Sequence, residues 1–144
     1  MKMYSGLITA FATVAAFATV APIQAQEVHL IARVPFEFTV GNANLPRDTY
    51  NLSRLTGHPE MVLVRGDRKS TFVRTDEVRL VRDGAAPSLL FHRYGDQYFL
   101  REIRWEGTAR LDLPESRAER DAAERRVDRL GAGMETVIVV AAQR

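Results

Sequence analysis

The chain has 144 residues, enough for one ordinary domain, and its 20 basic and 18 acidic residues leave a formal net charge of only +2. So small a charge excess gives little support to nucleic-acid binding. The absence of cysteine excludes disulfides, thiolate metal sites, thiol nucleophiles and cysteine-linked lipid anchors.

The N-terminus has the layout of a secretory signal peptide. Lys2 supplies a positive charge, residues 7–20 carry none, and residues 21–25 place small side chains at cleavage positions. We expect cleavage after Ala25, with a cut after Ala21 as the alternative, and export to the periplasm or the extracellular space. An uncleaved anchor is the rival interpretation, but the apolar run contains threonines and is nearer ~15 than ~20 residues. Cleavage leaves 144 − 25 = 119 residues as a single β-rich domain without a stable membrane span.

Alternating apolar residues predict a series of short strands after the leader. Residues 28–40 form the first, but Pro35 has no N–H, so this strand should lie at an edge or break into two pieces. Residues 41–46 are dense in turn formers and predict a loop. Further strands are predicted over residues 49–55 (Tyr50 and Leu52 inward), 61–65, 71–73 and 77–82. In the last of these, Val78 and Leu80 alternate with charged residues, which predicts one wet face.

Residues 88–105 predict a β-hairpin, because two runs rich in aromatic and aliphatic residues flank the turn pair Gly95-Asp96. A two-residue turn sets the register, and the expected facing pairs are Phe91 with Leu100, Arg93 with Tyr98, and Leu89 with Glu102. This hairpin holds the single Trp and two of the four Tyr residues, so we expect it to contribute much of the core.

A helix is predicted over about residues 114–130, with possible capping boxes at Asp112/Glu115 or Ser116/Glu119 and glycines after its end. Its apolar stripe is thin (Ala123, Val127 and Leu130), so the helix should lie lightly docked on the surface. The last strand, about residues 136–141, is apolar without alternation, which predicts that it is covered on both faces beside the first strand. The expected fold is therefore mainly β: an antiparallel β-sandwich or small barrel of about seven to eight strands, with one C-terminal surface helix before the last strand.

The sequence contains few groups arranged for chemistry. His29, His58 and His92 fall in different elements without the spacing of a zinc motif, and no serine lies in a hydrolase motif. We therefore predict no catalytic residues, no metal and no cofactor. The candidate ligand-binding residues all belong to the hairpin, and they are Phe91, His92, Tyr98 and Trp105.

Two basic stretches are interpreted as solvated surface. One contains Arg65, Arg68, Lys69, Arg74, Arg79 and Arg82, with Asp67, Asp76, Glu77 and Asp83 interleaved. The other is the predicted helix, whose five arginines are matched by Glu115, Glu119, Asp121, Glu124 and Asp128. We therefore predict a self-paired solvent face on the helix.

Several segments resemble those of a family of short, exported, uncharacterised bacterial proteins. They are VPFEFTVGN at residues 34–42, LP at 45–46 followed by Tyr50, FHRYGDQYFL at 91–100 and LPESRAER at 113–120. Members often carry a Pro-Ala-Gly turn before the tyrosine, where this chain has Pro46-Arg47-Asp48. The resemblance implies export and a similar fold, and it brings no functional residues with it.

Three hypotheses about function follow. The first is a non-catalytic exported β-domain with a binding or envelope-structural role and a protein or cell-envelope partner. The second is a carrier with a small apolar ligand inside a barrel, in a cavity lined by Phe36, Phe38, Tyr50, Phe72, Phe91 and Trp105. The third is a hydrolase that uses His92 with a nearby carboxylate, which requires the two side chains to lie within hydrogen-bond reach in a cleft.

Overall fold

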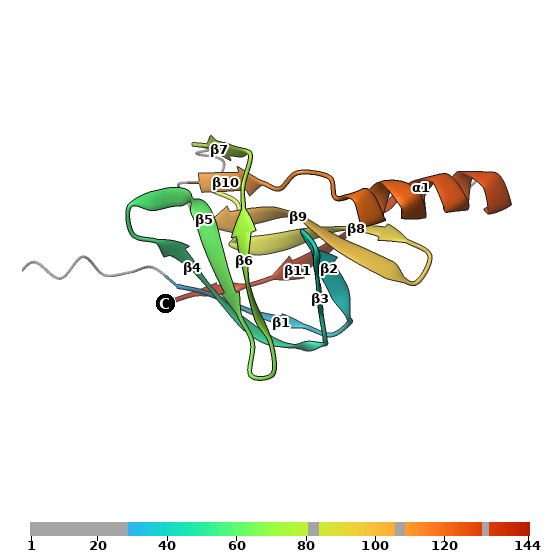
Figure 1. Ribbon diagram of the computed structural model, residues 1–144. Coiled ribbons are helices and arrows are strands. Elements are labelled where there is room, and N and C mark those ends of the chain that lie inside the picture. Colours follow the sequence, from blue (N-terminus) through green and yellow to red (C-terminus); the bar gives the residue numbers. More distant parts are fainter. Residues whose placement is uncertain (1–28, 81–83, 106–108, 131–132) are drawn as a thin grey trace, which may run out of the picture.

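The computed structural model describes residues 29–80, 84–105, 109–130 and 133–144. Within these residues, twelve strands form two sheets, and one helix precedes the last two strands (Figure 1). The sheets do not close into a barrel, so the predicted mainly-β fold is confirmed in its sandwich form, with more strands than expected. The predicted leader, residues 1–25, lies outside the described residues.

One sheet has five strands in the order β12-β1-β4-β5-β6, and all its neighbouring strands are antiparallel. Its strands are β1 (Leu30–Val34), β4 (Asp48–Leu55), β5 (His58–Arg65), β6 (Ser70–Arg74) and β12 (Ala142–Gln143). Tyr50 and Leu52 face the core, as predicted. Strand β5 begins earlier than expected, because Gly57 has a φ of 82° and closes the preceding turn within two residues.

The other sheet has seven strands, with β11-β8-β9-β10-β7 in order and β2 and β3 branching from β9. Its strands are β2 (Phe38–Val40), β3 (Ala43–Leu45), β7 (Glu77–Arg79), β8 (Ser88–Tyr94), β9 (Gln97–Trp105), β10 (Ala109–Asp112) and β11 (Glu135–Val140). The predicted loop at residues 41–46 has a turn at Gly41-Asn42, as expected, but it also contains strand β3, which pairs with β2. Strand β10 was not predicted, and β2 meets β9 in a parallel bridge at Thr39 and Phe99.

Pro35 divides the first predicted strand into two pieces, as expected from its missing N–H. Val34 ends β1 in the five-stranded sheet, and Phe38 begins β2 in the seven-stranded sheet. The chain therefore crosses from one sheet to the other at the proline, and the two strands keep their apolar residues directed into the same core.

The β8–β9 hairpin has the predicted turn, but its register shifts by one residue near the middle. The pairs Phe91–Leu100 and Arg93–Tyr98 form as expected. Leu89, however, faces Ile103 and not Glu102, because Arg101 is an extra residue at a β-bulge. The expected Leu89–Glu102 pair is therefore wrong, and the bulge changes the facing of every later residue in β9.

Strand β7 is more exposed than its alternation predicted. Val78 is 41% and Leu80 83% exposed, so these apolar residues do not form a buried face. The reason is its position, because β7 is the outermost strand of its sheet and pairs only with β10. Residues 81 and 82 of the predicted strand lie outside the described residues.

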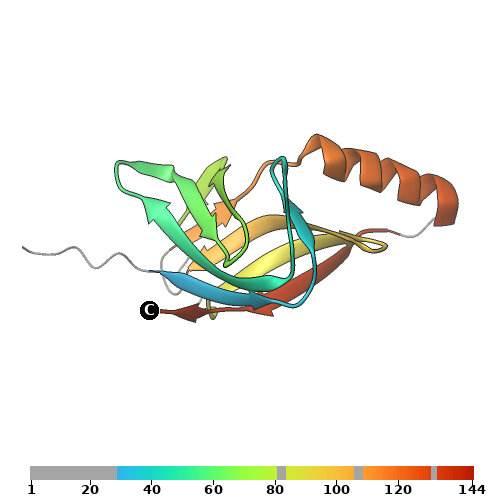
Figure 2. The same cartoon turned by 60° about the horizontal axis from the view of Figure 1, so that its bottom comes forward.

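The C-terminal segment takes part in both sheets, but it is not covered on both faces. Strand β11 is an edge strand that pairs with β8, and Ile138 and Val140 are 58% and 71% exposed. The prediction of double coverage and of pairing with the first strand is therefore wrong for residues 136–140. Within this segment it is β12, next to the C-terminus, that forms strand pairs with β1 (Figure 2).

Helix α1 (Arg117–Leu130) lies over the end of the β8–β9 hairpin (Figures 1 and 2). Of the predicted apolar stripe, Ala123 is half-buried and Val127 is 68% exposed, whereas the neighbouring Ala122 is buried. The side of the helix that faces the protein carries Glu119 and Ala122, as described below. Among the described residues, no helix has the length and apolarity needed to cross a bilayer.

Side chains from both sheets fill the space between them. The fully buried residues include Leu30, Phe38, Leu45, Tyr50, Leu52, Val62, Leu89, Phe91, Ile103 and Leu111. Tyr50 is central to this core: its ring meets that of Phe38 edge-on at 5.3 Å, and its hydroxyl donates to the carbonyl of Pro46. Burial raises the pKa of Tyr50 to about 12. Its phenol therefore stays protonated to higher pH than that of an exposed tyrosine.

Gly66 should be intolerant of a side chain because it packs against Tyr50. A Cβ at Gly66 would lie 2.6 Å from Cε1 of the fully buried Tyr50 ring. We expect Gly66→Ala to reduce the free energy of unfolding by about 1–3 kcal/mol, the usual cost of overpacking. Gly133→Ala is the matched control, because nothing lies within 4 Å of a Cβ there. Urea unfolding of both variants tests this, and equal stability of the two would contradict the packing described.

Candidate functional site

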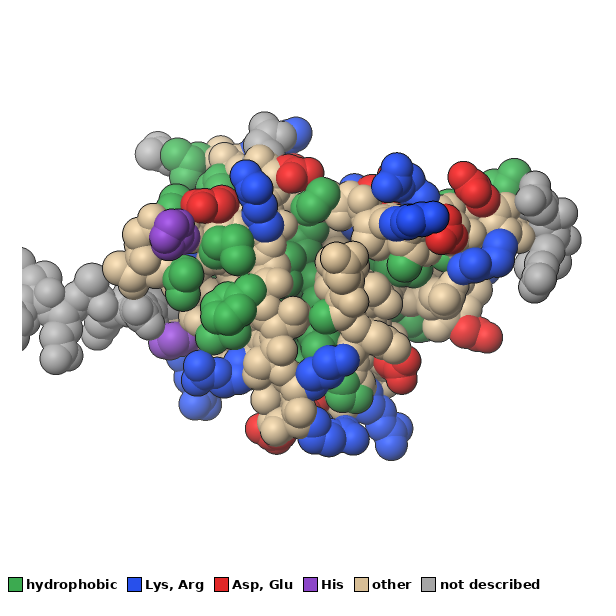
Figure 3. All heavy atoms as spheres, viewed as in Figure 1, with side chains coloured by type: hydrophobic (Ala, Val, Ile, Leu, Met, Phe, Trp, Pro, Cys, Tyr) green, Lys and Arg blue, Asp and Glu red, His purple; other side chains and the backbone are tan. Residues whose placement is uncertain are grey.

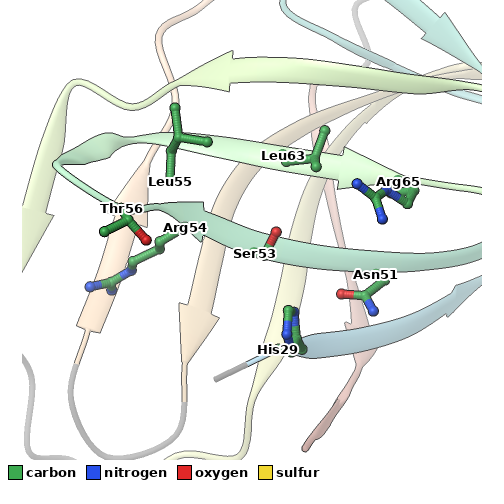
Figure 4. A pocket seen from close by; sticks show the side chains of 8 residues that line it. All are labelled: His29, Asn51, Ser53, Arg54, Leu55, Thr56, Leu63 and Arg65. Carbon is green, nitrogen blue, oxygen red and sulfur yellow. The ribbon is translucent and has the colours of Figure 1, made fainter. Parts of the chain in front are cut away.

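A hollow of ≈ 330 Å³ lies on the five-stranded sheet, on the face turned away from the core (Figure 4). We call it the outer pocket. The side chains of eight residues line it, and they are His29, Asn51, Ser53, Arg54, Leu55, Thr56, Leu63 and Arg65. His29 directly precedes β1, and the other residues come from β4 with its following turn and from β5.

Strand register explains why these residues come together. Asn51 of β4 lies directly opposite Arg65 of β5, and Ser53 lies opposite Leu63. Because side chains alternate along a strand and Leu52 faces the core, all four project from the outer face. The Asn51–Arg65 pair and the Ser53–Leu63 pair therefore lie next to each other on this face.

His29 forms one wall of the outer pocket, and its backbone is fixed by the C-terminus. The N–H of His29 donates to the carbonyl of Arg144 at 3.0 Å, and the N–H of Arg144 donates back at 2.9 Å. This reciprocal pair continues the β1–β12 ladder by one step. The position of the imidazole therefore depends on the last residues of the chain.

Arg54 leaves β4 in a different direction from Leu55 (Figure 4). Its guanidinium carbon lies 5.1 Å from the centre of the Trp105 ring, a cation–π distance. Partial burial of the side chain lowers the pKa of Arg54 from its usual value. The stacked guanidinium is thus held in place at the border of the outer pocket.

Among the described residues, the lining of the outer pocket is basic and contains no carboxylate. It includes Arg54, Arg65 and His29, and Arg65 makes no ion pair with a described residue. Asp48, at the start of β4, accepts the N–H groups of Thr49 and Asp67 in the turns. Those hydrogen bonds, that from Thr49 foremost, lower the pKa of Asp48. Arg65 is exposed, as the interpretation of this stretch as a solvated strand face expects.

A second hollow of ≈ 390 Å³, which we call the edge groove, lies beside β6. It is lined by residues 41–43 of the β2–β3 turn, residues 71–74 of β6, Leu113 and Pro114. Phe72 lies in this groove and is 58% exposed. Strand β6 is the last strand of its sheet, so the groove runs along an open sheet edge.

The candidate ligand-binding residues of the hairpin do not form one site. Phe91 is fully buried in the core and Trp105 nearly so, and both belong to the packing between the sheets. Tyr98 stacks on Phe36 at 3.8 Å. His92 contacts helix α1 and lies apart from these three. Six aromatic residues were expected to line a barrel cavity. Five of them pack in or against the core, whereas the sixth, Phe72, lies outside it.

His92 meets a carboxylate, but the acid comes from the helix. Its Nδ1 lies 2.9 Å from Oε1 of Glu119, whose side chain is 1% exposed. Arg101 donates to the other carboxylate oxygen at 2.9 Å, and the hydroxyl of Tyr94 lies 3.3 Å from Oε1. We call these four residues the Glu119 cluster.

The Glu119 cluster explains how an arginine-rich helix docks with few apolar contacts. Three donors from the hairpin surround one buried carboxylate, and the bulge at Arg101 brings its guanidinium to this position. The Ser116 hydroxyl accepts the N–H of Glu119 at 3.2 Å, which confirms one half of the predicted Ser116/Glu119 capping box. The expectation of a solvated Glu119 on a self-paired face is wrong, because its side chain points into the hairpin. Burial and Glu119 together raise the pKa of Tyr94.

Among the described residues, no group of three or more His, Asp and Glu side chains is placed to hold a metal ion. Comparison with protein-family models, with curated proteins and with solved structures gives no match. The chemical properties of the two hollows and of the Glu119 cluster are therefore what a functional proposal rests on.

Sequence reasoning missed the outer pocket and the burial of Glu119. Alternation in residues 61–65 places Leu63 and Arg65 on one face, but nothing in the sequence shows that Asn51 and Ser53 lie beside them. For Glu119, the one available signal was its position three residues after Ser116.

Removal of the buried charge should destabilise the docked helix. We expect Glu119→Gln to lower the free energy of unfolding by about 1.5–3 kcal/mol, the range for hydrogen bonds to charged groups. Glu124→Gln, at an exposed position on the same helix, should change it by less than about 0.5 kcal/mol. Chemical denaturation followed by circular dichroism measures both. If Glu119→Gln were as stable as Glu124→Gln, the cluster would not hold the helix.

Proposed function

We propose that this chain is an exported, non-catalytic β-domain that binds a small anionic ligand in the outer pocket. The N-terminal sequence, with its short uncharged apolar run and small residues at the expected cleavage positions, supports export. A β-sandwich provides a rigid support for a site built on its strands.

The observation that carries the proposal is the cationic lining of the outer pocket. Arg65 and His29 lie on the outer face around a hollow whose described lining contains no carboxylate, and Arg54 borders it from the core side, although the chain as a whole is close to neutral. Guanidinium groups bind carboxylates and phosphates through paired hydrogen bonds, and Asn51 and Ser53 supply further polar groups beside Arg65. The filled core between the sheets supports a surface site over an internal one.

The runner-up is a hydrolase that uses His92, and the 2.9 Å contact with Glu119 is the observation in its favour. Against it, Glu119 is already bound by Arg101 and Tyr94 and is 1% exposed, which suits helix docking better than proton transfer. Hydrolysis of ester substrates that disappears in His92→Gln would place this candidate first.

Ligand-dependent thermal unfolding tests the proposal. Butyl phosphate should raise the melting temperature, because a ligand at 100 times its Kd adds about 2.7 kcal/mol to the native state. Butyltrimethylammonium, with the opposite charge, should not. Arg65→Gln should abolish the rise without lowering the melting temperature of the free protein by more than a few degrees, since Arg65 is exposed.

Arg33→Gln is the matched control, because Arg33 is exposed on β1 of the same sheet but does not line the outer pocket. It should keep the full response to butyl phosphate. An equal response of the wild-type protein and Arg65→Gln would contradict an anion site at this pocket.

A further inference from the structure

We propose that the ligand of the outer pocket is a single amphiphilic anion, with a phosphate or carboxylate head at Arg65 and a linear hydrocarbon chain along Leu63 and Phe72. This inference rests on the proposed anion site and adds the chemical class of its ligand. Three features support it. They are a row of polar residues across neighbouring strands, a row of apolar residues beside it, and the two hollows at the ends of the apolar row.

The polar row crosses three strands. Asn51, Arg65 and Ser70 are direct neighbours on β4, β5 and β6, because Arg65 pairs with both of the others. Arg65 is exposed and has no ion-pair partner among the described residues. A guanidinium flanked by a carboxamide and a hydroxyl suits a head group with several acceptor oxygens.

The apolar row lies one step further along the same face. Leu63 pairs directly with Phe72, and Leu55, which is 39% exposed, lies on the neighbouring strand β4. Figure 3 shows hydrophobic side chains gathered over β4 and β5, with basic side chains and histidines at their border. Exposed apolar side chains that are gathered together and rimmed by polar groups mark binding surfaces.

The pair Leu63–Phe72 connects the two hollows. Leu63 lines the outer pocket, and Phe72 lines the edge groove. A path from Arg65 to Phe72 covers one two-residue step along β5 and one strand spacing, together about 11–12 Å. At about 1.3 Å per methylene of an extended chain, that length corresponds to about eight to ten carbons.

The charge and shape of the site favour one amphiphile molecule over a membrane surface. The cations line a hollow of ≈ 330 Å³, and the apolar path ends in a second hollow of ≈ 390 Å³, so both ends of a single chain have a place. A flat bilayer would contact the rims of these hollows and leave their linings unfilled. Binding to vesicles without binding of a monomeric amphiphile would therefore contradict the inference.

Isothermal titration with n-alkyl phosphates, from ethyl to dodecyl and below their micelle concentrations, tests chain recognition in the protein recovered after export. Each added methylene should lower the Kd about two- to fourfold, as expected for partial to full burial. The gain should level off at about eight to ten carbons, where the path from Arg65 to Phe72 ends.

Variants separate the head from the chain. Arg65→Gln should weaken every member of the series about tenfold or more. Leu63→Ser and Phe72→Ser should flatten the dependence on chain length, and Phe72→Ser, which lies outside the outer pocket, should leave the Kd of ethyl phosphate unchanged. Arg33→Gln should behave as wild type throughout, and decanol, which lacks the charge, should bind more weakly than decyl phosphate.

The possible failures are distinguishable. Equal Kd values for ethyl and decyl phosphate would overturn the amphiphile and leave the anion site standing. No binding of any alkyl phosphate would overturn both. Association with phosphatidylglycerol vesicles without binding of monomeric decyl phosphate would overturn the single-molecule inference in favour of a lipid surface.

Discussion

The C-terminal segment is the constraint on which the rest of this structure depends, because it pairs with both sheets. Strand β11 extends the seven-stranded sheet through β8, and β12 extends the five-stranded sheet through β1. The two sheets are thereby held together along one side, and the core side chains pack between them. The same pairing fixes the backbone of His29, so a wall of the outer pocket depends on the last residues of the chain.

A filled interior directs binding to the outside of the sandwich. Tyr50, Phe38 and Phe91 occupy the centre, where a carrier of the barrel type would need space. The outer face of β4 to β6, in contrast, combines Arg65, which makes no ion pair with a described residue, with exposed Leu55 and Phe72. Exposed apolar residues beside an unpaired cation do little for folding, and this is the physical reason to assign them to binding.

Local sequence patterns predicted most of the strands. They could not predict features that depend on contacts between distant segments. Alternation identified the inward residues of β4, and the missing N–H of Pro35 predicted the break between β1 and β2. The bulge at Arg101 was not predictable, because it depends on which neighbours β9 meets. Glu119 was read as solvated since charge usually is, yet three donors from a distant hairpin offset its burial. For the outer pocket, the sequence indicated only that Arg65 belongs to a basic stretch. The other lining residues could not be predicted, because the register between β4 and β5 cannot be read from either strand alone.

The central claim is that the binding surface is the outer face of the five-stranded sheet. Backbone amide chemical shifts, recorded by NMR during titration with octyl phosphate, test it most directly. The account predicts that the largest changes lie at Ser53, Leu63, Arg65 and Phe72, with small changes in the β8–β9 hairpin. Changes centred instead on His92 and helix α1, or spread through the core, would contradict it.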